Sequence, residues 1–140
     1  MKLYHGSKTL LTQLEKRQAQ QGETNVPKDE LLNGIYLTSD YGFAVAMAAR
    51  PDGETFLDDE KHTVSFKESN LFNPQENIYI YSFDSESIPG ENIKIVDSHQ
   101  YAVLGMESLP IQDTETIKTE KIFDYYKLTE WKDPKIENTE

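Results

Sequence analysis

Apolar and polar positions alternate along several short stretches of the chain, which is typical of half-buried β-strands. The clearest stretch is Ile35-Tyr36-Leu37-Thr38. Runs rich in β-branched and aromatic residues also favour strands. Together these patterns predict strands at residues 2–4, 35–38, 62–66, 78–83 and 101–104. The first of them ends at His5-Gly6-Ser7, where we expect the glycine to allow a tight turn.

One run is apolar on nearly all sides, which predicts a buried helix over residues 43–49. Ser39 or Asp40 can cap the start of this helix through a side-chain oxygen. Arg50-Pro51 ends it, because a residue that precedes proline disfavours the helical conformation. A strand, a cap and a buried helix are therefore expected in succession.

Two other segments have less regular patterns. Residues 10–21 carry three leucines followed by strong helix formers, which predicts a short helix, and the breakers in residues 22–30 predict a mobile loop after it. Residues 121–131 match either a helical face or an irregular strand, and both alternatives stay open.

Many short strands with one or two helices predict an α+β or mainly β fold. The length of 140 residues suits a single domain. We place this domain at residues 1–132 and expect the polar residues 133–140 to form a frayed tail. The hydrophobic content of 36% supports a packed core.

The formal net charge of −11 argues against nucleic acid as a partner, because phosphates are normally met by clustered Lys and Arg. The acidic run at residues 58–60 reads as a solvated loop, although its carboxylates are a possible cation site. The chain has no cysteine, and His5, His62 and His99 have no paired metal-ligand spacing. We expect no metal, and a metal site would have to be built mostly from carboxylates.

No apolar run approaches the roughly 18 residues of a membrane span. The amino terminus lacks the apolar segment of a signal peptide. These two features predict a cytoplasmic protein with no membrane partner.

Three short motifs follow one another along the chain: Leu3-Tyr4-His5-Gly6-Ser7, then Gly34-Ile35-Tyr36-Leu37-Thr38-Ser39 ahead of an alanine-rich run, then Gln100-Tyr101-Ala102-Val103. Their order resembles the catalytic segments of the ADP-ribosyltransferase superfamily, in particular the poly-ADP-ribose polymerase branch and the small bacterial rifamycin ADP-ribosyltransferases. The resemblance implies a split β-sheet core and a reaction in which NAD is cleaved at the nicotinamide bond. ADP-ribose would then pass to a protein or small-molecule acceptor, with NAD as substrate and no metal.

The same resemblance implies roles for individual residues. His5 would bond a ribose hydroxyl, Gly6 would hold the nicotinamide amide through its backbone, and Tyr36 would pack on the nicotinamide ring. Ser7 and Thr38 complete the two motifs and would also contact NAD. These residue types suit the chemistry, because nicotinamide departs as a neutral molecule and the protein has only to orient NAD and stabilise the developing cation.

Gln100 occupies the position at which the polymerase branch has a catalytic glutamate. An amide can accept a bond from a ribose hydroxyl but carries no charge, which argues against chain elongation to poly-ADP-ribose. Asp97 and Glu107 are alternative acids for this position. Strand parity places Asp97 on the face opposite Gln100 unless a bulge intervenes, and Glu107 lies beyond the strand.

Three other hypotheses stay open. The side chain of His5 can form a hydrogen bond within a turn, and Tyr36 can pack in the core, without any ligand. A domain that binds NAD or ADP-ribose without turnover would keep the same motifs while Gln100 abolishes catalysis. A toxin or phage-type effector that modifies nucleic acid is disfavoured by the acidic charge. The aromatic residues Tyr79, Tyr81 and Phe83 favour a role in the core or on the sheet surface over base stacking, and without flanking Lys or Arg they are weak evidence for nucleic acid.

Overall fold

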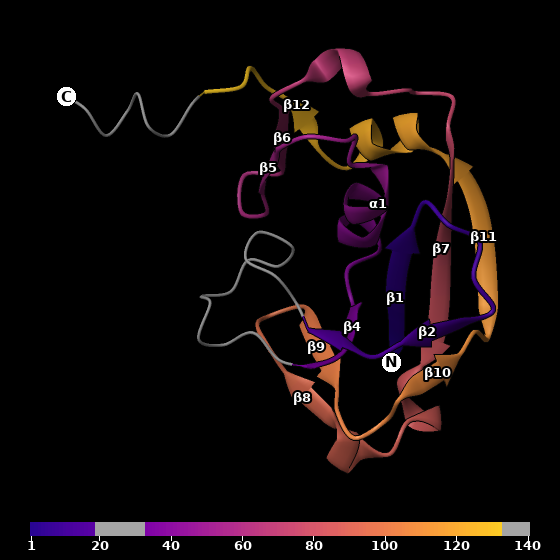
Figure 1. The fold of residues 1–140 in the computed structure, drawn as a ribbon. Helices are drawn as coiled ribbons and strands as arrows, with labels where there is room; N and C mark the ends of the chain where they lie inside the picture. Colours follow the sequence, from indigo (N-terminus) through magenta and orange to yellow (C-terminus); the bar gives the residue numbers. More distant parts are fainter. Residues whose placement is uncertain (19–32, 133–140) are drawn as a thin grey trace.

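The computed structural model describes residues 1–18 and 33–132, and their fold is mixed α+β (Figure 1). Among these residues there is one α-helix, and most other regular elements are short strands. The mobile loop expected at residues 22–30 and the frayed tail expected at residues 133–140 lie outside the described residues. The broad fold class predicted from the sequence is confirmed.

A seven-stranded sheet forms the centre of the molecule, in the order β11-β7-β1-β4-β9-β8, with β3 paired to β4 away from this path. Every neighbouring pair in it is antiparallel. Its strands are β1 (Lys2–Ser7), β3 (Arg17–Gln18), β4 (Asn33–Thr38), β7 (Asn77–Asp84), β8 (Ile93–Ile95), β9 (Gln100–Val103) and β11 (Asp113–Lys118).

Two smaller sheets accompany the central one. The first pairs β2 (Gln13–Glu15) with β10 (Ser108–Pro110), and the second has the order β12-β6-β5, formed by β5 (Thr55–Asp58), β6 (Thr63–Phe66) and β12 (Lys127–Leu128). Short 3-10 helices connect the strands: η2 (Ser69–Leu71), η3 (Ser85–Ser87), η4 (Gly90–Asn92) and η5 (Thr119–Asp124).

The helix α1 (Tyr41–Ala49) packs against β1, β7 and η5 and lies beside β1 in Figure 1. Seven of its nine residues are buried, as its apolar sequence predicts. The side chain of Asp40 caps the helix by accepting a hydrogen bond from the backbone amide of Phe43 at 3.2 Å. The predicted cap and the predicted buried helix are both confirmed.

Two apolar cores lie on the two faces of β7, because neighbouring side chains of a strand point to opposite faces. Ile78 and Ile80 pack with α1, β6 and η5. Tyr81 and Phe83 pack on the other face with residues of β1, β2 and β4. Of the two alternatives that the sequence leaves open, core or sheet surface, these two aromatic residues take the core.

Strand β1 has very different contacts with its two neighbours. It pairs with β7 at all six of its positions. In the described chain it pairs with β4 only at Tyr4 opposite Thr38. Beyond this pair the described parts of β1 and β4 are not paired, and residues of both strands line a cavity.

Three sequence-based predictions about local structure are wrong or incomplete. Residues 13–15 and 17–18, which lie in the predicted helix, are strands β2 and β3. Gly6 lies inside β1 and not in a turn. The ambiguous segment 121–131 contains both a 3-10 helix and a short strand, β12. Leu14 explains the first error, because it is buried opposite Leu109 of β10, and this pairing outweighs local helix propensity.

Candidate functional site

A cavity of about 600 Å³ opens where β1 and β4 separate, and we call it the β1–β4 cavity. Its walls come from β1, β2, β4, α1 and the first residue of β9. Apolar side chains supply much of the wall: Leu11, Leu14, Ile35, Leu37, Phe43 and Met47. An apolar cleft with a few polar groups is the usual form of a small-molecule site.

The residues that the sequence singles out meet in this cavity. They come from three strands and all line its wall: His5, Gly6, Ser7, Tyr36, Thr38 and Gln100. The two alternative acids, Asp97 and Glu107, are not among the lining residues that the structure describes. Motifs as far apart in the chain as His5 and Gln100 therefore share one surface.

The imidazole of His5 is oriented by the backbone of β4. Its Nδ1 atom lies 3.0 Å from the carbonyl oxygen of Tyr36. A carbonyl oxygen can only accept a hydrogen bond, so Nδ1 carries the proton and Nε2 of the neutral ring is an acceptor. The ring also stacks on Tyr81, with centroids 6.5 Å apart and an interplanar angle of 17°. This arrangement suits a ligand hydroxyl that donates to Nε2.

Gly6 is required by packing. A Cβ atom at this position would lie 2.1 Å from the carbonyl oxygen of Ala44 and 2.8 Å from the Cβ atom of Ala48. Strand β1 can approach α1 only because this residue has no side chain. The glycine thus has a structural reason that holds with or without a ligand.

Thr38 links the cavity wall to the start of α1. Its hydroxyl donates to the carbonyl oxygen of His99 at 2.8 Å and accepts from the backbone amide of Asp40 at 3.1 Å. The side chain is buried. Thr38 therefore fixes the junction of β4 and α1 beside the cavity.

Gln100 is buried at the start of β9, and its amide is held by Asp97. The side-chain amide nitrogen of Gln100 donates to one carboxylate oxygen of Asp97, and the backbone amide donates to the other at 2.9 Å. Because the NH₂ group faces Asp97, the amide oxygen is the end that can accept from a ligand. Asp97 lies in the turn before β9 and positions the side chain of Gln100.

Two charged residues on the cavity wall were missed in the sequence. Among the described lining residues, Glu15 of β2 is the carboxylate and Arg50, at the end of α1, is the cation. Glu15 lay in the segment predicted to be a helix, so nothing in the sequence placed it near the motifs. Glu107, by contrast, forms a surface ion pair with Lys16 at 3.0 Å, and its side chain is 86% exposed.

A second cavity, of about 410 Å³, adjoins the first and shares Ser7, Met47 and Arg50 with it. Lys8 also lines this adjoining cavity. The hydroxyl oxygen of Thr55 is buried on its wall without a hydrogen-bond partner among the described residues. Lys8 is paired with Glu76 at 2.9 Å and the carboxylate of Asp52 also lines this cavity, so Arg50 and the Thr55 hydroxyl are the groups here that suit an anion.

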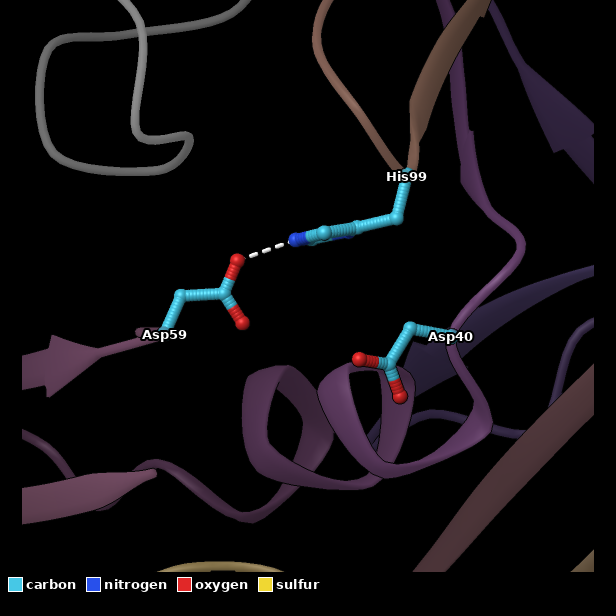
Figure 2. A group of neighbouring side chains, drawn as sticks. All are labelled: Asp40, Asp59 and His99. Atoms are coloured by element: carbon cyan, nitrogen blue, oxygen red, sulfur yellow. Dashed lines mark hydrogen bonds and ion pairs between the residues drawn. The ribbon is translucent and has the colours of Figure 1, made fainter. Parts of the chain in front are cut away.

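A separate group of side chains has the geometry of a metal site. Asp40, Asp59 and His99 each direct one potential ligand atom into a region where these atoms lie within 4.8 Å of one another (Figure 2). They come from the start of α1, the turn between β5 and β6, and the turn before β9. We call this group the His99 cluster.

Comparisons of the chain with protein-family models, with curated proteins and with solved structures find no match. The described residues contain no helix that is long and apolar enough to cross a membrane. The β1–β4 cavity and the His99 cluster are therefore the features of the molecule that point to a function.

Proposed function

We propose that this protein binds NAD in the β1–β4 cavity, cleaves it at the nicotinamide bond and transfers ADP-ribose to a protein or small-molecule acceptor. The observation that carries the proposal is the convergence of His5, Tyr36 and Gln100, from three separate motifs, on one cavity wall. If the motifs resembled the family only by chance, we would not expect their residues to line the same cavity. The fold would be of the ADP-ribosyltransferase type, with a split sheet.

We assign a task to each of three wall residues, and hydrogen bonds orient the side chains of two of them, His5 and Gln100. Nε2 of His5 accepts a bond from a ribose hydroxyl, Tyr36 packs on the nicotinamide ring, and the amide oxygen of Gln100 accepts from a second ribose hydroxyl. Arg50 and the Thr55 hydroxyl, on the adjoining cavity, suit the diphosphate, whereas Lys8 would have to leave its ion pair with Glu76 to reach it. NAD would then run from the β1–β4 cavity into the adjoining one.

The charge that develops on the ribose needs a carboxylate, and Gln100 cannot supply one. Glu15 is the carboxylate on the described cavity wall, so we assign the stabilising charge to it. Asp97 contributes indirectly by holding the amide of Gln100.

A second candidate function is a domain that binds NAD or ADP-ribose without cleaving it. The neutral side chain at Gln100 is the observation that favours it. Both functions use the same cavity, and they differ in whether nicotinamide is released.

Nicotinamide release from NAD, followed by chromatography, separates the two. We expect release by wild type, with candidate acceptors present, and its loss in His5→Ala and in Gln100→Ala. Gln100→Glu combined with Asp97→Asn, which removes the carboxylate that faces Gln100, should retain or raise it by restoring charge near the developing cation. Circular dichroism of each variant checks its fold. If wild type binds NAD but does not cleave it, the protein is a binding domain. If wild type neither binds nor cleaves NAD, both proposed functions are refuted.

A further inference from the structure

We infer that the His99 cluster binds one divalent first-row transition metal ion, such as zinc, through His99 Nε2 and the carboxylates of Asp40 and Asp59. The inference is independent of NAD and departs from the sequence-based expectation that the protein has no metal. His99 contributes one imidazole and the two aspartates contribute oxygens, which is a ligand set that zinc accepts.

The hydrogen bonds of Thr38 decide which nitrogen of His99 carries a proton. The hydroxyl proton of Thr38 is directed at the carbonyl oxygen of His99, at 2.8 Å. The same hydroxyl oxygen lies 3.1 Å from His99 Nδ1, so it must accept there, and Nδ1 carries the hydrogen. In the neutral ring the lone pair is then on Nε2.

The Nε2 atom of His99 faces a carboxylate oxygen of Asp59 in direct contact, as Figure 2 shows. Two electron-pair donors in contact share a proton, and a metal ion bound to both atoms would replace that proton and hold the two side chains farther apart. The second carboxylate, on Asp40, converges on the same region. A shared proton does not require this third ligand, whereas three protein ligands and a water molecule form a four-coordinate zinc site.

Every ligand side chain is oriented by an outer partner, as in established metal sites. Thr38 holds His99, and the backbone amide of Phe43 holds Asp40 at 3.2 Å. The hydroxyl of Tyr126 donates to Asp59 at 3.3 Å, through the oxygen that does not face His99.

The charge of the cluster also favours a dication. Two carboxylates with a neutral imidazole carry a formal charge of −2, and in the described chain no Lys or Arg forms an ion pair with either aspartate. The side chains of His99 and Asp59 are only 14% and 22% exposed, so solvent screens this charge poorly. The amino-terminal end of α1 contributes about half a positive charge, which two carboxylates outweigh.

The test is a calorimetric titration of the untagged chain of 140 residues with zinc chloride, after removal of metal by a chelator and dialysis into chelator-free buffer. We expect one zinc per chain in wild type, and at least about tenfold weaker binding in Asp59→Asn and in His99→Gln. Both substitutions keep a polar side chain of similar size, and circular dichroism verifies their fold.

Matched controls separate the cluster from ordinary surface carboxylates. Asp58→Asn changes the neighbouring aspartate, and His62→Asn changes an exposed histidine whose positive φ of 55° asparagine tolerates. Both should bind zinc as wild type does. Wild type that binds no zinc, or equal binding in Asp59→Asn, His99→Gln and the controls, overturns the proposal and leaves a His–Asp ion pair.

X-ray absorption of zinc-loaded wild type gives a readout that needs no variant. We expect a first shell of oxygen and nitrogen atoms with the outer scattering of a single imidazole. A shell without imidazole scattering would overturn the assignment of His99.

Discussion

The Nδ1 atom of His5 lies 3.0 Å from the carbonyl oxygen of Tyr36, although 31 positions separate the two residues. The contact forms where β1 and β4 have already separated, so a side chain takes the place of a ladder hydrogen bond. It fixes the orientation of the imidazole on the cavity wall. The same contact ties the two motifs together in the absence of any ligand.

Substitution of Tyr36 by alanine should weaken NAD binding several-fold or more. Aromatic contact of this kind contributes on the order of 1 kcal/mol beyond burial. Isothermal calorimetry of wild type and Tyr36→Ala measures the change. Phe56→Ala is the control, because Phe56 is 54% exposed and is not on the described wall of the cavity. Equal affinity in a folded Tyr36→Ala protein would exclude Tyr36 from the binding site.

Gly6→Ala should destabilise the protein by about 1–3 kcal/mol or more, because overpacking of a tight contact costs energy of this order. The added methyl group would meet the backbone of α1 at Ala44, which cannot move without the whole helix. Urea unfolding followed by circular dichroism measures the loss. Gly90→Ala is the control, since nothing lies within 4 Å of the Cβ position there. A loss in Gly6→Ala no greater than in Gly90→Ala would contradict this packing.

Tyr81→Phe should lower the free energy of unfolding by about 1–3 kcal/mol at neutral pH, because it leaves a backbone amide without its partner. The hydroxyl of Tyr81 accepts from the amide of Leu11 at 2.7 Å and donates to the carbonyl oxygen of Thr9 at 2.6 Å. Chemical denaturation measures the change. An unaltered stability would mean that solvent replaces both bonds.

The same residue predicts a dependence of stability on alkaline pH. Burial is the main cause that raises the pKa of Tyr81 above the ordinary value of 10.0. The unfolded chain releases this proton near its ordinary pKa, whereas the folded chain retains it to higher pH, so this contribution to stability is complete below pH 10 and falls above it. The free energy of unfolding, measured from pH 8 to about 11, should therefore decline less steeply in Tyr81→Phe than in wild type. An equal decline of the free energy of unfolding in both proteins would refute the contribution of Tyr81.

Much of the site's local structure could be predicted from the sequence. The strand before Thr38, the cap at Asp40 and the buried helix after it depend on neighbouring residues, so their pattern is visible in the chain. Their meeting with β1 and β9 depends on long-range pairing, which a single sequence does not display. The resemblance of the motifs supplied that expectation.

One strand and two side-chain positions could not be predicted from the sequence, and each case has a physical reason. Strand β11 is at the edge of the central sheet and five of its six residues are exposed, so it carries no apolar signal. Asp59 meets His99 across 40 positions, whereas the acidic run around it predicts a solvated loop. Glu15 reached the cavity wall because its neighbour Leu14 is buried against Leu109, a contact that no local pattern indicates.

Glu15→Gln should lower the rate constant of nicotinamide release at least about tenfold, which corresponds to a loss of roughly 1.4 kcal/mol of transition-state stabilisation. The dissociation constant for NAD should change little, because the positive charge on the ribose develops only during cleavage. Single-turnover kinetics separates the two quantities. Glu107→Gln is the matched control, since its carboxylate pairs with Lys16 on the surface. An unchanged rate in Glu15→Gln would remove Glu15 from the mechanism.

Titration of ¹⁵N-labelled protein with NAD, followed by amide chemical shifts, tests most directly whether NAD binds in the β1–β4 cavity. We predict that the largest shifts fall on amides of the cavity wall, above all His5, Gly6, Tyr36 and Gln100. A separate shallow cavity lined by His62 and residues 123–128 serves as an internal reference and should shift little. The absence of shifts at saturating NAD, or shifts confined to that reference surface, would contradict the central claim.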